Sequence, residues 1–202
     1  MTSVLFALML QVPPQSIPTG CTWTVVPGVC ADATAGPCLT LIPTCPPPAP
    51  YEIGDVAVLP SDDGGNAGLV LAQPVVVIAP ALLSTLSFYV VAPAGALRLG
   101  LYASDCKTGL PGELLAQAEL GAVGVGWNAT PKLLPVVALA PGTYWLAYAP
   151  ADNRLTFRVD RAAGHALYFA APYAAGFPAV WPTVGVTAIV SRWSMKAGVI
   201  GQ

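Results

Sequence analysis

The stretch from Leu97 to Tyr148 decides the fold class of this chain. It begins LRLGLYASDCKTGLPGELLAQAEL (Leu97–Leu120) and ends LAPGTYWLAY (Leu139–Tyr148). The dipeptide Pro141-Gly142 is a turn signal, and it introduces a second run that is rich in aromatic residues. At the start of the first run, alternate residues form two sets, as in a strand whose side chains face opposite sides. We expect Leu97, Leu99 and Leu101 to point inward, and Arg98, Gly100 and Tyr102 to point outward. The stretch therefore indicates strands of a β-sandwich or barrel.

The same alternation recurs on both sides of this stretch. Residues 86–91 set Leu86, Phe88 and Val90 against Ser87, Tyr89 and Val91, and residues 155–160 set Leu155, Phe157 and Val159 against Thr156, Arg158 and Asp160. No segment shows four helical turns with an apolar stripe. We therefore predict an all-β protein, an antiparallel jelly-roll-like sandwich of about eight to ten short strands.

Composition limits the choice of partners. Of 202 residues, 55% are hydrophobic and only 9% are charged, where about 25% is typical. The surplus apolar surface predicts contact with other subunits, including a homo-oligomer. The net charge of -2, with scattered basic residues, argues against nucleic acid. Residues 64–97 carry no charge, but prolines and Gln73 interrupt them, so we predict buried strands there and no membrane span.

The first 50 residues differ from the rest. Residues 1–50 contain one charged residue, Asp32, and many prolines, including the run CPPPAP at 45–50. Proline removes backbone donors and disfavours both helices and central strands. We therefore predict two parts, an extended N-terminal attachment arm over residues 1–50 and a β-sandwich domain over residues 51–202.

Four of the five cysteines lie in this arm, at Cys21, Cys30, Cys38 and Cys45. Their spacings match no zinc pattern and no histidine accompanies them, so disulfides are the favoured interpretation over reduced thiols. Three pairings are possible, and we favour Cys21 with Cys30 and Cys38 with Cys45. Disulfides would place the protein outside a cell or on a particle surface. The fifth cysteine, Cys106, is predicted to be a free thiol in a loop.

Residues suited to catalysis are few. The only histidine, His165, has no nucleophile motif near it, so a structural role is favoured. The segment SDDGGN suits a turn, although Asp62, Asp63 and Asn66 are also a weak candidate for a Ca²⁺ site. We predict no catalytic residue, no resident metal, no cofactor and no enzymatic activity.

Aromatic residues offer the remaining candidate site. Flat aromatic faces beside polar donors bind sugars, and period two places Trp145 on the face opposite Tyr144 and Leu146. Arg98, Tyr102 and Trp145 are therefore the candidate contacts for a glycan or a partner. Subunit packing is the alternative for the same aromatic residues.

Three of these segments carry a resemblance. The runs GALRLGLYASDCKTGLPGELLAQAEL, GWN and LAPGTYWLAY resemble a β-sandwich domain of tail fibres, head fibres and related surface proteins of tailed bacteriophages. The resemblance covers about Ser84 to Asn153, and it brings no catalytic residues. It implies that ELLAQAEL, which could also form a helical turn, is a strand.

The resemblance implies a structural component of a virion, located on the particle surface. Its partners would be other virion proteins, either the major capsid protein or fibre and tail subunits. A capsid decoration, cement or head-fibre protein is the favoured role. The alternative is a tail-fibre or head-fibre adhesin that binds a glycan of the host surface.

Overall fold

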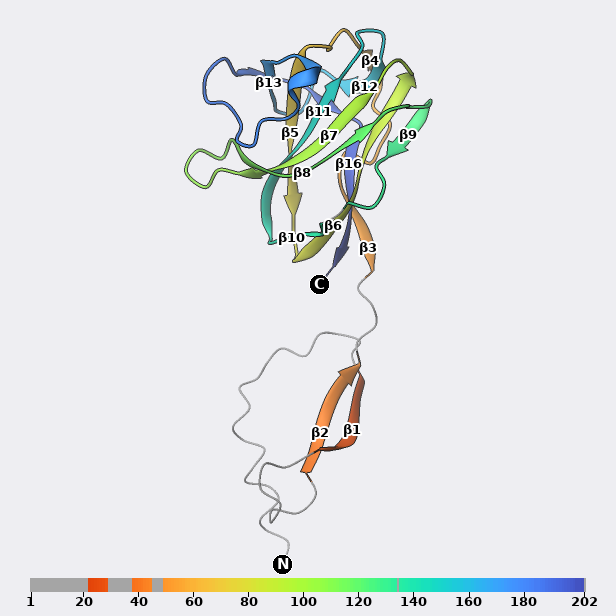
Figure 1. Ribbon diagram of the computed structural model, residues 1–202, viewed down its shortest axis with the longest axis vertical. Helices are drawn as coiled ribbons and strands as arrows, with labels where there is room; N and C mark the ends of the chain where they lie inside the picture. The colour runs from red at the N-terminus through yellow and green to blue at the C-terminus, as the bar shows by residue number, and fades with distance from the viewer. Residues whose placement is uncertain (1–21, 29–37, 45–48, 134, 202) are drawn as a thin grey trace, which may run out of the picture. The chain divides into compact units, whose positions relative to one another are not determined.

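The computed structural model describes residues 22–28, 38–44, 49–133 and 135–201 (Figure 1). The chain divides into two compact units, Met1–Pro47 and Pro48–Gln202.

The first unit contains an antiparallel hairpin of β1 (Thr22–Gly28) and β2 (Cys38–Thr44). Its register runs from the pair Thr22 and Thr44 to the pair Gly28 and Cys38. A two-stranded ribbon gives each strand a side without a partner strand, which is where proline is tolerated. Pro27 and Pro43 therefore do not prevent pairing, and the predicted extended arm includes a hairpin.

The second unit consists of two antiparallel sheets (Figure 1). In the first sheet the order is β15-β12-β6-β16-β3; in addition, β4 pairs with β12, and β9 and β10 pair with β6. Its strands are β3 (Pro50–Gly54), β4 (Ser61–Asp63), β6 (Ala81–Ala92), β9 (Gly126–Ala129), β10 (Val137–Leu139), β12 (Thr156–Asp160), β15 (Arg192–Trp193) and β16 (Met195–Gly201).

In the second sheet the order is β14-β13-β5-β11-β7-β8. Its strands are β5 (Leu69–Val77), β7 (Leu97–Ser104), β8 (Pro111–Leu120), β11 (Gly142–Pro150), β13 (Ala166–Ala170) and β14 (Thr187–Ile189). A short 3-10 helix, η1 (Tyr173–Ala175), lies between β13 and β14. Consecutive strands repeatedly change sheet, for example β5, β6 and β7, as they do in a jelly roll. The prediction of an all-β antiparallel sandwich is confirmed.

The core between the sheets follows the predicted alternation. All three inward sets are at most 1% exposed and belong to one apolar cluster: Leu86, Phe88 and Val90; Leu97, Leu99 and Leu101; Leu155, Phe157 and Val159. Phe88 forms its aromatic centre, with its ring centroid 4.7 Å from that of Tyr148 and 4.8 Å from that of Phe157. The alternation of hydrophobic residues along these strands thus predicted the buried face correctly.

Two local expectations differ from the structure. The segment SDDGGN was expected to be a turn, but Ser61–Asp63 forms β4, because its backbone pairs with β12. The sandwich also has more strands than the eight to ten expected, since several are very short. β15, for example, has two residues, which is too few to show alternation.

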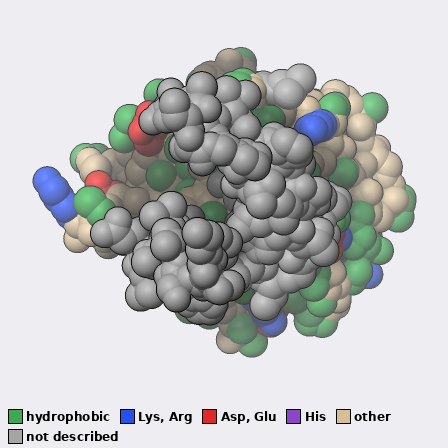
Figure 2. Space-filling view, turned by 90° about the horizontal axis from the view of Figure 1, so that it is seen from below, with side chains coloured by type: hydrophobic (Ala, Val, Ile, Leu, Met, Phe, Trp, Pro, Cys, Tyr) green, Lys and Arg blue, Asp and Glu red, His purple; other side chains and the backbone are tan. Residues whose placement is uncertain are grey.

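The surface is poor in charge. In the view of Figure 2, isolated Lys, Arg, Asp and Glu side chains lie scattered among hydrophobic and neutral groups of the described residues. Of the helices in the described part of the chain, none is long and apolar enough to cross a membrane.

Candidate functional site

The outer face of the second sheet is covered by a second apolar layer. The segment 171–186 crosses this face, and its Phe177 and Trp181 are 7% and 3% exposed. The Tyr102 ring lies beneath them, with its centroid 5.2 Å from that of Trp181. The Tyr102 hydroxyl donates to the Pro178 carbonyl at 2.9 Å. We call residues 171–186 the flap.

Two of the three candidate contacts for a glycan or a partner are buried. Trp145 and Tyr102 do pair across β11 and β7, as an outward set would, but their exposed fractions are 2% and 0%. The Trp145 indole N–H donates to the Gly109 carbonyl at 3.3 Å, and the His165 ring lies at 5.9 Å from the Trp145 ring. The face that points away from the core is buried because the flap covers it.

The third candidate, Arg98, fastens the flap. Its guanidinium donates to the Tyr173 carbonyl and to the Glu119 carboxylate, both at 2.8 Å. The guanidinium carbon also lies 4.4 Å from the centre of the Tyr173 ring, a cation–π distance. Burial, and then the Glu119 charge, raise the pKa of Tyr173 to about 12. Both terminal nitrogens of the Arg98 guanidinium thus bind partners within the protein.

The weak Ca²⁺ candidate is occupied by side-chain interactions. Asp62 forms an ion pair with Arg158 at 2.8 Å, and the Oδ1 atom of Asp63 forms one with Arg161 at 2.8 Å. The Oδ2 atom of Asp63 accepts from the Asn66 amide at 2.9 Å and from an indole N–H at 2.8 Å. Asp62 and Asp63 are successive residues of a strand, so their side chains leave it on opposite sides. The two carboxylates therefore do not converge on one ion.

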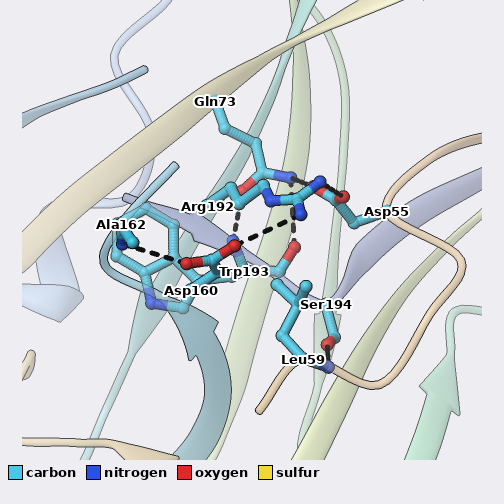
Figure 3. A network of polar contacts seen from close by, with 8 residues as sticks. All are labelled: Asp55, Leu59, Gln73, Asp160, Ala162, Arg192, Trp193 and Ser194. Atoms are coloured by element: carbon cyan, nitrogen blue, oxygen red, sulfur yellow. Dashed lines mark hydrogen bonds and ion pairs between the residues drawn. The ribbon is translucent and has the colours of Figure 1, made fainter. Parts of the chain in front are cut away.

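A polar network that the sequence analysis missed joins the two sheets (Figure 3). Gln73 is 2% exposed and points from β5 into the sandwich. Its Oε1 accepts from the Trp193 backbone N–H at 2.7 Å, and its Nε2 donates to the Trp193 carbonyl at 3.1 Å. Nε2 also donates to Asp55 at 3.1 Å. The amide of Gln73 thus pairs with β15 as a neighbouring strand would.

Arg192 connects two carboxylates in the same network. Its guanidinium lies 2.8 Å from Asp55 and 3.2 Å from Asp160 (Figure 3). Burial raises the pKa of Asp55, against the opposing effect of Arg192. Near these residues, the buried Ser194 hydroxyl accepts a hydrogen bond from the Leu59 backbone N–H at 2.9 Å. A single Gln within the apolar run LVLAQPVVV was the only sequence signal of this network.

The carboxylates near the surface predict a loss of stability in acid. The Arg154 side chain and its backbone N–H hold the pKa of Asp152 at about 2, below the ordinary 3.8. The Ala162 backbone N–H lowers the pKa of Asp160. A carboxyl group whose pKa is lower in the folded state than in the unfolded state stabilises the fold at pH values above its unfolded-state pKa. This stabilisation is lost as the pH falls through the folded-state pKa. Asp55, with its raised pKa, acts in the opposite sense.

We therefore expect the thermal midpoint of unfolding to decrease as the pH is lowered from 3.8 to about 2. The variant Asp152→Asn should show a shallower decrease, because it lacks one of the groups that must be protonated. Calorimetry over this range measures both slopes. Equal slopes for the two proteins would contradict the contribution assigned to Asp152.

The described residues contain no group of three or more His, Cys, Asp or Glu side chains that could hold a metal ion. Three surface grooves have volumes of about 290, 290 and 380 Å³. The residues that line each of them include at most one carboxylate. Cys106 is exposed and unpaired.

Of the four cysteines in the arm, three lie outside the described residues: Cys21, Cys30 and Cys45. Cys38 begins β2 opposite Gly28. The pairing of these cysteines stays a prediction.

The register of the hairpin divides its residues into two faces. Three pairs of apolar residues share one face: Trp23 with Pro43, Val25 with Leu41, and Pro27 with Leu39. The other face is rich in threonine: Thr22 with Thr44, Thr24 with Ile42, and Val26 with Thr40. We call the first set the apolar face of the hairpin. The apolar face requires both strands, because each strand contributes three of the six residues.

No protein-family model and no curated protein matches the sequence. Among solved structures, a similar chain is found in the structure of the Gt strain of infectious bursal disease virus, with 14% identity and a TM-score of 0.30 over 88% of this chain. The VP2 subviral particle of that virus is similar, with 13% identity and a TM-score of 0.30 over 88% of this chain. The chain spans only 37% and 38% of these two chains. Likeness at this level assigns neither a family nor a function.

Proposed function

We propose that this protein is a non-enzymatic structural component of a bacteriophage virion. Residues 1–50 attach it to the particle, and residues 51–202 project from the surface as a capsid decoration, cement or head-fibre domain. The proposal rests on the location in the fold of the segments that resemble phage fibre domains. The two longer segments lie mainly on β7, β8 and β11, which are consecutive neighbours in one sheet, and GWN lies on β9 of the other sheet. The resemblance thus falls on strands of the scaffold in both sheets.

The polar residues of the sandwich support a structural role. Arg98 fastens the flap, Arg192 joins two carboxylates, and Gln73 links the two sheets. Each of these groups makes hydrogen bonds within the fold and holds together segments that are distant in sequence. A catalytic group, in contrast, needs a free position beside a substrate.

The hairpin supports attachment through the arm. An isolated two-stranded hairpin is marginally stable at best in water and needs its apolar face covered. Between residues 1 and 50 the only charged residue is Asp32, so attachment by the hairpin would rely on apolar contact. The partner that we propose for the apolar face is another virion protein, either the major capsid protein or a fibre or tail subunit.

The test compares particles made with three forms of the gene. The wild-type protein should copurify with particles in a density gradient. The double variant Val25→Asp with Leu39→Asp should remain in the lysate, because it places two carboxylates on the apolar face. Mass spectrometry of the particle band measures the amount of bound protein.

The matched control carries the same two charges on the threonine-rich face, as Thr24→Asp with Thr40→Asp. In each double variant, the second substitution lies two residues before the direct cross-strand partner of the first, so the two charges are equally spaced in both variants. The control should bind particles as the wild type does. Absence of the wild-type protein from particles would contradict the proposed function, and equal loss in both variants would contradict attachment through the apolar face.

The adhesin alternative has no specific support from the described residues. Two of its three candidate contacts, Tyr102 and Trp145, are buried beneath the flap. A glycan could reach them only if the flap opened.

A further inference from the structure

One border of the second sheet is only partly capped. β8 pairs with β7 along one side. On its other side, the first part of the strand bonds to the flap: the Leu114 N–H donates to the Ala179 carbonyl at 2.9 Å, and the Trp181 N–H donates to the Gly112 carbonyl at 2.8 Å. From Leu115 to Leu120, the described residues provide no second backbone partner. Half of β8 is therefore an open edge (Figure 1).

The open edge lacks the devices that usually protect such edges. Natural edge strands carry charged side chains, prolines or covering loops. Between Leu115 and Leu120 the only charged residue is Glu119, and its carboxylate is bound by Arg98 at 2.8 Å. The only proline of β8, Pro111, lies at its capped end. This half of β8 can therefore accept another strand.

The side chains along the open edge form two rows. The inward row lies opposite core residues of β7 and consists of Ala116, Ala118 and Leu120. All three are only partly buried, at the margin of the main core. Gln117 and Glu119 alternate with them and point away from the core. A strand added to β8 would complete the burial of the inward row.

A groove of about 290 Å³ adjoins this border, and none of the residues that line it is charged. Across from β8 it is lined by Leu133, Pro135 and Val137, at the start of β10 and just before it. Val136, which lies between two of these residues, is 45% exposed. Apolar surface gathered at one place is typical of sites where proteins associate. The border thus combines unpaired backbone groups with exposed apolar side chains.

A second copy of the same strand is self-complementary to this edge. Two antiparallel strands related by a two-fold axis pair residue i with j and j with i, so one surface supplies both sides of the contact. Directly opposite residues share a face of the sheet. The inward rows of the two copies therefore meet only if the axis passes through a residue position and not between two residues.

The contacts of β8 select one position for this axis. At Gln117 or earlier, the second copy would meet Leu114, whose N–H the flap already binds. At Glu119, two carboxylates would lie directly opposite each other, which is destabilising. At Leu120, the pairing would run past the end of β8. Within the open edge, Ala118 remains, and its small side chain lets the two strands approach.

We propose that two copies of this protein pair through the open edges of β8, antiparallel and about a two-fold axis at Ala118. The inward rows then form one continuous apolar row, in which Ala116 lies opposite Leu120 of the second copy. Glu119 lies opposite the uncharged Gln117 of the second copy. This inference goes beyond the proposed function, because attachment to the particle uses the hairpin and does not require that the sandwich domains pair.

The test measures hydrogen–deuterium exchange in full-length protein over a series of protein concentrations, by mass spectrometry of peptides that cover Leu115–Leu120. At high concentration these amides should be protected in the wild type. On dilution they should exchange about tenfold faster, because the two copies separate and the edge returns to water.

The variant Gln117→Glu nearly keeps the shape of an exposed side chain and places a second carboxylate opposite Glu119 of the other copy. At the concentration that protects the wild type, its edge amides should exchange about tenfold faster, because like charges directly opposite each other weaken strand pairing. The control, Thr187→Glu, adds the same charge at an exposed position of β14, at the other border of the same sheet. It should exchange as the wild type does.

Peptides from β5 and β11 should exchange equally in all three proteins, which shows that the sandwich is folded. Equal exchange of Leu115–Leu120 in the wild type and Gln117→Glu at every concentration, or equal acceleration in both variants, would overturn the proposal. The measurement needs no particles, so its failure is separate from a failure of the proposed function.

Discussion

Replacing Phe88 by Ala should lower the free energy of unfolding by about 3–5 kcal/mol, the largest effect that we expect from a single substitution. The Phe88 ring is fully buried and packs edge-on against Phe157 and at a tilt against Tyr148. Its removal leaves a cavity between two aromatic rings that β11 and β12 hold in place. Urea denaturation followed by tryptophan fluorescence measures the change.

The control for this prediction is Phe88→Leu, which keeps most of the volume and should cost less than about 1.5 kcal/mol. The denaturant slope should stay the same in both variants, because the surface exposed on unfolding changes little. A loss below 1 kcal/mol for the Ala variant would show that the core closes around the cavity, and would contradict the packing described here.

Replacing Gln73 by Leu should lower the free energy of unfolding by about 2–4 kcal/mol, because it leaves buried polar groups without partners. The Trp193 N–H would lose its acceptor, and the Trp193 carbonyl would lose a donor. Asp55, whose pKa burial already raises, would lose one of its two hydrogen-bonding partners. Leu has nearly the volume of Gln, so the loss reports hydrogen bonding more than packing.

The matched control is Gln117→Leu, the same change at an exposed position of β8. The Gln117 side chain makes no hydrogen bond within the described structure, so we expect a change within about 0.5 kcal/mol. The same urea experiment measures both variants. Equal effects at the two positions would contradict the role of Gln73 as the link between the sheets.

The strands that line the core were predictable because their pattern is local. A residue at every second position of residues 97–101 or 155–159 faces the same side of any strand, so the hydrophobic set identifies the core face without knowledge of its partners. β8 was less certain. Its alternation is interrupted by a bulge between its pairs with Leu101 and Tyr102, and only the resemblance favoured a strand over a helical turn.

The candidate site was not predictable in the same way. Tyr102 and Trp145 do lie on the outward face and beside each other, as the alternation indicated. Their exposure, however, depends on Phe177 and Trp181, which follow them in the chain by more than 30 residues and belong to a segment without strand periodicity. Alternation distinguishes two faces of a sheet, but it does not reveal that a later segment covers one of them.

The amino-acid sequence by itself determined that this protein is an all-β sandwich, which side of each long strand forms the core, and that the first 50 residues differ from the rest. These properties depend on hydrophobic period and on proline, and both act over a few neighbouring residues. Only the tertiary structure decided which polar groups are occupied, which aromatic residues are covered, and that half of β8 is open. Those properties depend on contacts between distant segments, such as Gln73 with Trp193 and Arg98 with the flap, which no local pattern encodes.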